Sequence, residues 1–289
     1  MRVFIYILTT DTSTSKNMSS TYVKYDIRVF DKFIDKFARK YIEQRSVSKL
    51  DILQAAERLG SDFDISQIKS IIERNSVYED PFREKGETPP ILNDIYRSDL
   101  GELLTTYYFE EKLGAIERYI IPAKNISTRE RHDMPGRGID AIGYRIKEDG
   151  TKELLIAEAK VSSQHSSPPA VVDSTSDSMY STHKKYHDDS SILRQRLVEY
   201  SKNLKGTDLA AIFFFVLNIE KGIPIDITYG CGLVRDSTCV NEFTDYGKMK
   251  SCETEFEPGR IRFTIFSFTE ETIDSTIDLF YKKVKELVQ

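Results

Sequence analysis

The segment 136–161 constrains the fold of this chain more than any other part of the sequence. It contains two apolar-rich runs on either side of Asp149-Gly150, a dipeptide typical of turns between antiparallel strands. We therefore predict a β-hairpin. The second run, LLIAEAKV, is apolar or small except for Glu158 and Lys160. Burying two charges is costly unless they are paired or functional, so this strand is expected to carry a site.

Three ionisable residues of the hairpin are predicted to meet at its open end. Glu158 and Lys160 are two residues apart on one strand, so they project from the same face. Asp140 lies far from the turn on the other strand, and the antiparallel return of the chain brings it alongside. Two neighbouring carboxylates repel each other unless a cation lies between them, and their hard oxygen ligands suit Mg2+. A nearby ammonium group can orient water and stabilise charge on a phosphate.

This arrangement requires a particular pairing register. Residues that face each other in an antiparallel pair lie on the same side of the sheet. If Asp149-Gly150 were a two-residue turn, Asp140 would oppose Ala159, and its side chain would lie on the opposite face from Glu158. We therefore predict a three- or five-residue loop, or a bulge, that shifts the pairing by one residue.

The same residues carry a resemblance to a known superfamily. The order of an Asp, a turn and a strand with Glu-x-Lys resembles the PD-(D/E)XK nucleases, with Asp140 and Glu158-Ala159-Lys160 as the matching positions. The Pro that precedes the Asp in the superfamily pattern is Ile139 here. Members usually add an acidic residue from a preceding helix.

The upstream helix extends the resemblance. In SDLGELLTTYYFEEK, Glu102 occupies the position of that acidic residue. Its Gly-Glu-Leu-Leu sequence, the Gly-Ile-Asp strand and the closing strand and helix are similar to the HamA family of Hachiman antiphage defence, which is encoded beside a helicase called HamB. The resemblance spans roughly residues 95–289, about the size of one ordinary domain.

The resemblance implies metal-dependent cleavage of nucleic acid. Asp140, Glu158 and Ala159 would provide the ligands of Mg2+ or Mn2+, and Lys160 would lie near the attacking water. Glu102 would be an accessory ligand or an orienting residue. These roles come from the family pattern and not from spacing.

Two of these assignments have structural alternatives. A Glu-x-Lys pattern on an exposed strand is commonly a solvated pair of charges, although the apolar surroundings of Glu158 and Lys160 favour a site. Glu102 has a second interpretation that remains open: if Asp99 is a helix N-cap, Glu102 is the third helical residue and completes a capping box.

The remaining periodicity predicts an α/β protein: a restriction-endonuclease-like mixed central sheet with flanking helices, preceded by a mainly helical N-terminal region. The Pro- and Gly-containing stretch 80–90 suggests a division into residues 1–90, a region for docking a partner or DNA, and 91–289, the nuclease-like domain. Residues 162–191 are expected to form a long exposed loop. Helices are predicted over 27–44, 50–59, 64–74, 100–112, 191–204 and 271–288, and strands over 118–122, 138–146, 153–161, 210–218 and 260–269.

Composition limits the partners and the compartment. The chain has 289 residues and a formal net charge of -5, so bulk charge does not draw it to DNA. DNA binding would need a bound metal, a partner's surface or a local basic patch. No apolar run approaches the length of a membrane span, and three cysteines imply no disulfide framework, so we expect a cytoplasmic protein without membrane contact. The best local basic patch comprises Lys184, Lys185, Arg194, Arg196, Lys202 and Lys205.

Together with these observations, the resemblance implies a Mg2+-dependent deoxyribonuclease that acts as the effector of an antiphage complex with a HamB-type helicase. The alternative is a catalytically silent nuclease-like fold that serves as a DNA-binding or regulatory subunit. Retention of Asp140, Glu158 and Lys160 argues for the enzyme, because a binding module has no need to keep buried carboxylates together.

Overall fold

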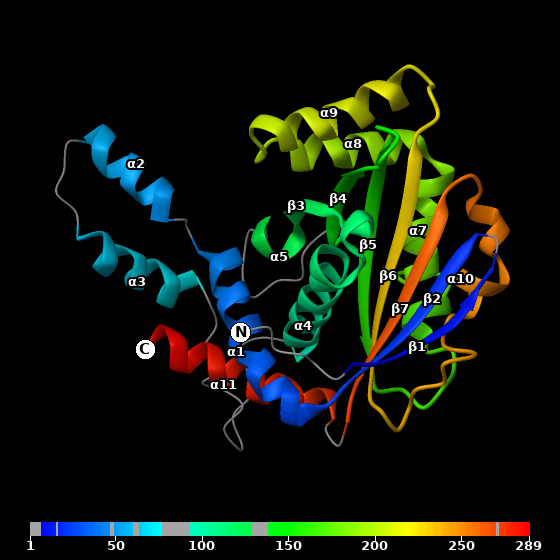
Figure 1. Ribbon diagram of the computed structural model, residues 1–289, viewed down its shortest axis with the longest axis horizontal. Coiled ribbons are helices and arrows are strands. Elements are labelled where there is room, and N and C mark those ends of the chain that lie inside the picture. The colour runs from blue at the N-terminus through cyan, green and yellow to red at the C-terminus, as the bar shows by residue number, and fades with distance from the viewer. Residues whose placement is uncertain are drawn as a thin grey trace.

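A mixed seven-stranded sheet runs through the part of the chain that the computed structural model describes, namely residues 7–15, 17–46, 49–59, 64–76, 93–128, 138–269 and 272–289 (Figure 1). Its strand order is β1-β2-β7-β6-β5-β4-β3. The strands are β1 (Ile7–Thr14), β2 (Met18–Tyr25), β3 (Ile120–Lys124), β4 (Ala141–Ile146), β5 (Lys152–Ser162), β6 (Asp226–Arg235) and β7 (Arg260–Phe268).

Helices cover both faces of this sheet (Figure 1). The longer ones are α1 (Ile27–Arg45), α2 (Lys49–Leu59), α3 (Ile65–Ser76), α4 (Asn93–Tyr107), α7 (Met179–Asp188), α8 (Ser190–Ser201), α9 (Gly206–Glu220) and α11 (Ile273–Val288). Short turns are the π-helical η1 (Tyr108–Lys112), the 3-10 turns η2 (Ala115–Glu117) and η3 (Glu253–Phe256), and α5 (Asn125–Thr128), α6 (Ala170–Asp173) and α10 (Gly247–Ser251). No helix within the described ranges has both the length and the apolar character needed to cross a bilayer.

Strand direction divides the sheet into a parallel centre and antiparallel margins. β2, β7, β6 and β5 run parallel to one another, whereas β1 pairs antiparallel with β2, and β4 pairs antiparallel with both β5 and β3. Parallel neighbours need crossover connections, and α6 to α9 provide the connection from β5 to β6. The hairpin of β4 and β5 therefore lies beside the parallel centre.

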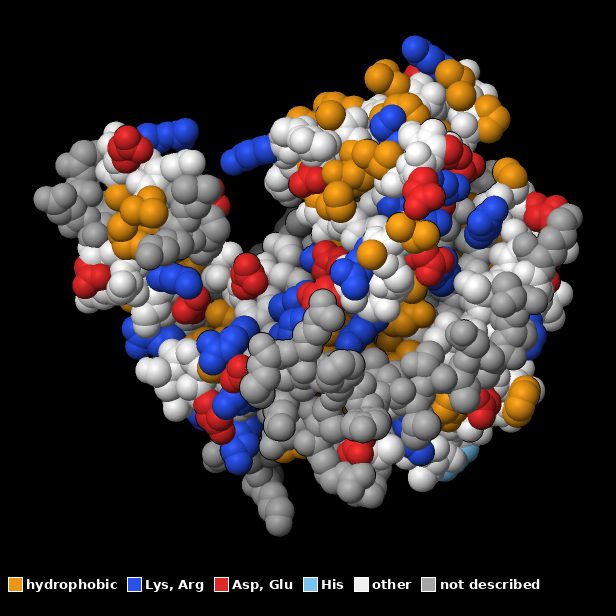
Figure 2. Space-filling view, viewed as in Figure 1, with side chains coloured by type: hydrophobic (Ala, Val, Ile, Leu, Met, Phe, Trp, Pro, Cys, Tyr) orange, Lys and Arg blue, Asp and Glu red, His pale blue; other side chains and the backbone are white. Residues whose placement is uncertain are grey.

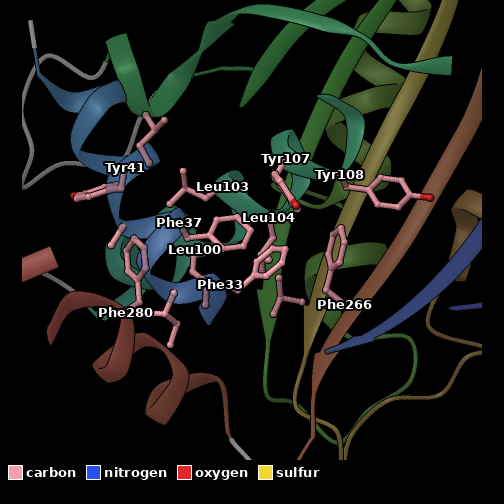
Figure 3. Close-up of a cluster of buried hydrophobic side chains, with 14 of the residues drawn as sticks. Phe33, Phe37, Tyr41, Leu100, Leu103, Leu104, Tyr107, Tyr108, Phe266 and Phe280 are labelled. Atoms are coloured by element: carbon pink, nitrogen blue, oxygen red, sulfur yellow. The ribbon is translucent and has the colours of Figure 1, made fainter. Parts of the chain in front are cut away.

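One face of the sheet is covered by α1, α4 and α11, which share a large aromatic core (Figure 3). Phe33 and Phe37 of α1 pack edge-on against Tyr107 of α4, with ring centroids 5.4 and 5.0 Å apart. Tyr41 packs against Phe280 of α11 with centroids 5.5 Å apart. Such edge-to-face pairs stabilise a core beyond their buried area. Residues from both ends of the chain therefore meet in one core.

The predicted α/β class is confirmed, and most predicted elements lie within a few residues of the observed ones. Asp64 is the N-cap of α3 as predicted, since its carboxylate accepts a hydrogen bond from the Gln67 amide at 3.0 Å. The predicted boundary at residues 80–90 lies outside the described residues. The helix predicted over 100–112 begins earlier, at Asn93, which matters for the site.

The prediction of a strand over residues 210–218 is wrong, because this segment lies in α9. Ile212 and Phe215 are fully buried at helical spacing, whereas Phe213 and Leu217 are exposed. A short continuous apolar run fits a buried strand and a helix equally well by periodicity. The glycine after this segment distinguishes a helix from a strand. Gly222 adopts a positive φ of 66°, which is typical of a residue that follows a helix.

The strand that replaces it in the sheet, β6, was not predicted. Two glycines interrupt its apolar pattern, and both allow a close approach of the neighbouring face. A Cβ on Gly232 would lie 1.9 Å from the Thr105 hydroxyl oxygen of α4, and one on Gly230 would lie 2.8 Å from the Phe109 ring. Glycine in a strand is therefore a requirement of packing here.

The N-terminal region is less helical than predicted. Residues 18–25 form β2, which pairs with β7 along eight residues, from Met18 opposite Ile261 to Tyr25 opposite Phe268. The helical part begins at Ile27. The pairing partner lies more than 240 residues away in sequence, a relation that no local pattern contains.

Residues 162–191 form more regular structure than the long exposed loop that we predicted. They contain α6 and α7, and α7 buries Met179, His183 and Tyr186 against the sheet. The hydroxyl of Ser178 caps α7 by accepting from the Ser181 amide, in a capping box with serine at both positions. A run rich in serine and aspartate conceals this helix, since the same residues favour turns.

Candidate active site

The register of the β4–β5 hairpin brings the two predicted carboxylates together. Ala141 pairs with Ala157, and Ile146 pairs with Lys152, which leaves a five-residue loop over 147–151. One step beyond the first pair, Asp140 lies beside Glu158. The predicted shift of the pairing by one residue is confirmed, and of the three alternatives it is the five-residue loop that produces it, without a bulge in this pair.

A backbone hydrogen bond orients Asp140. The amide of Ala159 donates to Asp140 Oδ2 at 2.7 Å, which ties the carboxylate to the strand that carries Glu158 and Lys160. Asp140 directly precedes β4. Two residues earlier, Gly138 has a φ of 101°, a backbone conformation that favours glycine and that directs the chain into the site. The carboxylate position is therefore set by main-chain geometry.

Glu158 is a buried carboxylate whose negative charge is poorly compensated. Its side chain is 5% exposed, and Oε1 lies 3.0 Å from the Lys160 ammonium. Burial, and next the negative charge of Asp140, raise the pKa of Glu158 above its usual range, and the Lys160 ion pair opposes this only in part. Within the described residues, Oε2 has no hydrogen-bond partner.

Lys160 remains charged beside these acids. Burial lowers its pKa, but the neighbouring Glu158 and Asp140 carboxylates outweigh this and raise it overall. Its ammonium also lies 3.7 Å from Asp177, an exposed carboxylate on the loop before α7 with a positive φ of 54°. Asp177 was missed by the sequence analysis, because its Ser- and Asp-rich loop gives no sign of where it folds.

The structure excludes one of the two interpretations of Glu102. Because α4 begins at Asn93, both Asp99 and Glu102 lie in the helix interior, so the capping-box alternative is wrong. Glu102 is 1% exposed, and the Ser98 hydroxyl donates to its Oε1 at 3.1 Å. A buried carboxylate inside a helix needs another explanation.

Tyr200 of α8 contacts the hairpin just before Asp140. Its hydroxyl donates to the Ile139 carbonyl at 2.5 Å, one residue before Asp140. Burial, and then the charges of Asp140 and Glu102, raise the pKa of Tyr200. Glu102 therefore lies near enough to affect this side of the site. The spacing of Tyr200 in the sequence did not single it out.

The donor set fits a divalent cation held by two carboxylates. Nowhere in the described ranges do three His, Cys, Asp or Glu side chains gather as a metal site, so Glu102 does not join Asp140 and Glu158 in one such cluster. Water and a main-chain oxygen, such as that of Ala159, would complete the ligands. The repulsion between the two acids and the unbonded Oε2 of Glu158 are both relieved by a cation.

The predicted basic patch is weaker than its composition suggests. It lies on α7, α8 and the turn after them, and three of its six cations form ion pairs with acidic neighbours. These pairs are Lys184 with Asp188, Arg194 with Glu220, and Arg196 with Glu199. The patch therefore offers less net charge to a phosphate backbone than a count of Lys and Arg implies.

An Asp before one strand and a Glu-x-Lys on the next, at one end of a mixed sheet, is the arrangement expected of the PD-(D/E)XK class. Comparison of the whole chain shows the family: the model of the HamA family matches residues 2–284, so the chain belongs to the HamA family. No curated protein is found to match it. The match also covers the N-terminal region, which the sequence resemblance over residues 95–289 had left out. Membership of this family is consistent with an antiphage defence protein.

Proposed function

We propose that this protein is a metal-dependent DNA nuclease and the effector of an antiphage complex with a helicase. The observation that carries the proposal is the pairing of Asp140 with Glu158 beside Lys160. Glu158 is buried on β5 and Asp140 is half-buried just before β4, where two like charges are unfavourable without a purpose. A catalytically silent binding subunit would not need them.

Each residue of the site has a distinct part in the proposed reaction. Asp140, Glu158 and the main chain of Ala159 would hold Mg2+ or Mn2+, and a bound cation of this kind polarises a phosphodiester and makes water easier to deprotonate. Lys160 contributes a fixed positive charge that orients the attacking water and stabilises negative charge developing on the phosphate. Glu102 and Tyr200 would orient the main chain and the bound water at the end of the hairpin that carries Asp140.

Cleavage assays with conservative variants test the proposal. Plasmid DNA is incubated with the wild-type complex and Mg2+, with EDTA, and with Asp140→Asn, Glu158→Gln and Lys160→Met variants. We expect each variant, and EDTA, to reduce cleavage by at least about a thousandfold, because members of one catalytic unit fail together. Glu148→Gln, an exposed change at the turn of the same hairpin, should leave cleavage unchanged.

Thermal melting separates a functional from a structural role. Removing one of two repelling carboxylates should leave the melting temperature of Glu158→Gln in EDTA equal to or above that of wild type. Mg2+ should raise the melting temperature of wild type but not of this variant. Full cleavage by all three variants would contradict the assigned site, and the absence of cleavage by the wild-type complex in Mg2+ would favour the silent alternative.

The helicase partner is proposed on the basis of charge and exposed apolar surface. At a net charge of -5 the chain gains little from long-range attraction to DNA, so a partner that grips DNA would compensate. Hydrophobic side chains gather on the surface over α2 and α3, and separately over α8 and α9 (Figure 2). Leu53 of α2 and Ile71 of α3 are 41% and 44% exposed, which supports the N-terminal region as the docking surface.

Co-purification with a HamB-type helicase tests this part. We expect a complex on size-exclusion chromatography that is lost in a Leu53→Asp/Ile71→Asp double variant. Leu217→Asp on α9 is the matched control, since Leu217 is also exposed, at 56%. Loss of the complex in the Leu217→Asp control alone would place the docking surface on α9. Failure of the wild-type chain to form a complex with the helicase would contradict the proposed partner.

A further inference from the structure

A polar pocket opens at the opposite end of the sheet from Asp140 and Glu158. Its volume is about 260 Å³, and it lies where β2, β6 and β7 begin. Three arginines line it, together with one acidic and several uncharged polar residues. The lining includes Arg145, Arg260, Arg262, Glu117, Thr228 and Asn17.

The pocket is separate from the candidate active site. Thr228 pairs with Leu155 and Arg260, whereas Glu158 pairs with Cys231, three residues further along β6. Side chains alternate between faces along a strand, so Thr228 and Cys231 project from opposite faces. The pocket therefore differs from the nuclease site both in its position along the strands and in its face of the sheet.

The Tyr119 ring and the Glu153 carboxylate hold the Arg145 side chain in the pocket wall. Its guanidinium lies over the Tyr119 ring at 5.0 Å and donates from Nη2 to the buried Glu153 carboxylate at 2.9 Å. The side chain is only 12% exposed, and its buried Nε has no hydrogen-bond partner among the described residues. A guanidinium with an unused donor is prepared for another acceptor.

The other two arginines are more available. Arg262 donates to Glu117 at 2.9 Å, but the Glu117 side chain is 44% exposed, so solvent can replace it at little cost. Arg260 is exposed and forms no ion pair within the ranges that the structure describes. The Glu117 carboxylate thus occupies a position that another anion can take.

We propose that this pocket binds a phosphate group, which replaces the Glu117 carboxylate on Arg262 and is also held by Arg260 and Arg145. Arginine matches phosphate oxygens with two parallel donors, and three converging guanidinium groups suit a doubly charged anion. The volume exceeds that of a lone phosphate, so the group would belong to a nucleotide or to a nucleic-acid strand. This inference does not depend on nuclease activity.

The test uses the full chain in EDTA, so that no metal at Asp140 and Glu158 contributes. Calorimetric titration with pyrophosphate, AMP and a 5′-phosphorylated single-stranded oligodeoxynucleotide is performed at constant ionic strength. We expect Arg260→Ala/Arg262→Ala to weaken binding by about tenfold or more, since charge-assisted hydrogen bonds are lost. Glu117→Gln should tighten it, because a competing carboxylate is removed. Arg39→Ala, an exposed arginine on α1, should match wild type.

The probes distinguish the sources of the phosphate. Tight binding of AMP assigns the pocket to a free nucleotide, whereas binding of the oligonucleotide alone assigns it to a nucleic-acid strand. Wild-type affinity in the double arginine variant would overturn the proposal, as would the absence of binding of every probe to both wild type and Glu117→Gln. A Glu158→Gln variant should bind as wild type does, which keeps this result independent of the nuclease site.

Discussion

Two buried glutamates on β5, five residues apart, lie in opposite electrostatic surroundings. Glu153 is 2% exposed and Glu158 is 4% exposed, so burial alone disfavours the charge of both. Hydrogen bonds and ion pairs overcome burial at Glu153 and lower its pKa to about 2, whereas burial and Asp140 raise the pKa of Glu158. The groups that donate to Glu153 are the hydroxyls of Thr228 and Tyr119 and the cations of Lys147 and Arg145.

This contrast separates a structural carboxylate from one suited to chemistry. The charge of Glu153 is fully satisfied by protein groups and therefore stabilises the fold. Glu158 keeps an oxygen without a hydrogen bond next to a second acid. The Lys160 ion pair compensates the negative charge of Glu158 only in part, which is the expected behaviour of a ligand-binding group.

Glu153→Gln should destabilise the fold by about 3 kcal/mol at pH 7, because two cations lose their buried partner. The pKa of Glu153 is lower when folded than the ordinary 4.5, so its contribution is complete above pH 4.5 and is lost as the pH falls towards 2. Urea unfolding at pH 7, 5 and 3 measures this. The free energy of unfolding should fall more steeply between pH 5 and 3 in wild type than in the variant. An equal fall in the free energy of unfolding in both proteins would contradict this role of Glu153. The exposed substitution Glu148→Gln is the control.

At the scale of elements, the contact between α4 and β6 positions the site. Gly232 leaves room for Thr105, and one helical turn earlier Gly101 lies against β5, where its Cβ would be 2.8 Å from Val161. Small residues on facing elements let a helix approach a sheet closely. This close packing brings Glu102 of α4 near the end of the hairpin that carries Asp140.

Gly232→Ala should therefore destabilise the protein by about 2 kcal/mol or more through overpacking. Its Cβ would meet Thr105 Oγ1 at 1.9 Å and Thr105 Cβ at 2.8 Å. Adding Thr105→Ala removes the nearer contact but keeps the second, so the double variant should recover part of the loss. Denaturant unfolding of the four proteins in this cycle measures the coupling.

Gly114→Ala is the matched control for the effect of Gly232→Ala on stability. Gly114 is a surface glycine whose added Cβ would meet only Glu117 Oε2, at the ordinary contact distance of 3.6 Å. Gly114→Ala should change stability by less than about 0.5 kcal/mol. If Gly232→Ala were as mild as this control, the close approach of α4 to β6 would not be a constraint on the fold.

At the scale of the whole molecule, the N-terminal region is built into the sheet and its core. β2 covers the edge of β7, and Phe33, Phe37 and Tyr41 of α1 fill the space between α4 and α11 (Figure 3). The family match over residues 2–284 likewise includes the N-terminal region.

The fragment 91–289 should consequently fail to fold cooperatively. Without the earlier residues, the edge of β7 is unpaired and the apolar faces of α4 and α11 are exposed, which favours aggregation. Circular dichroism melting and size-exclusion chromatography of the fragment, beside the full chain, measure this outcome. A monomeric fragment with a sharp thermal transition would instead support two independent domains with a boundary at residues 80–90.

The hairpin and its acidic pair could be predicted from the sequence because the information is local. Asp149-Gly150 marks the turn, strand alternation relates Glu158 to Lys160, and the need for a shared face determines the register. The helix over Ile27–Arg45 was predictable for the same reason, since its apolar stripe repeats within a few residues. Short-range periodicity requires no knowledge of what the element packs against.

Contacts between distant segments decided the rest. The strands β2 and β6, the helical state of α9 and the interior position of Glu102 all depend on partners far away in sequence. Glycine at 230 and 232 weakens a strand by propensity but is required where α4 and the Phe109 ring approach, and an apolar run such as 210–217 becomes helix or strand according to the surface that buries it. The sequence by itself determined the local geometry of the acidic hairpin, whereas tertiary packing placed Glu102, Tyr200 and Asp177 around it, because burial is a property of the whole fold.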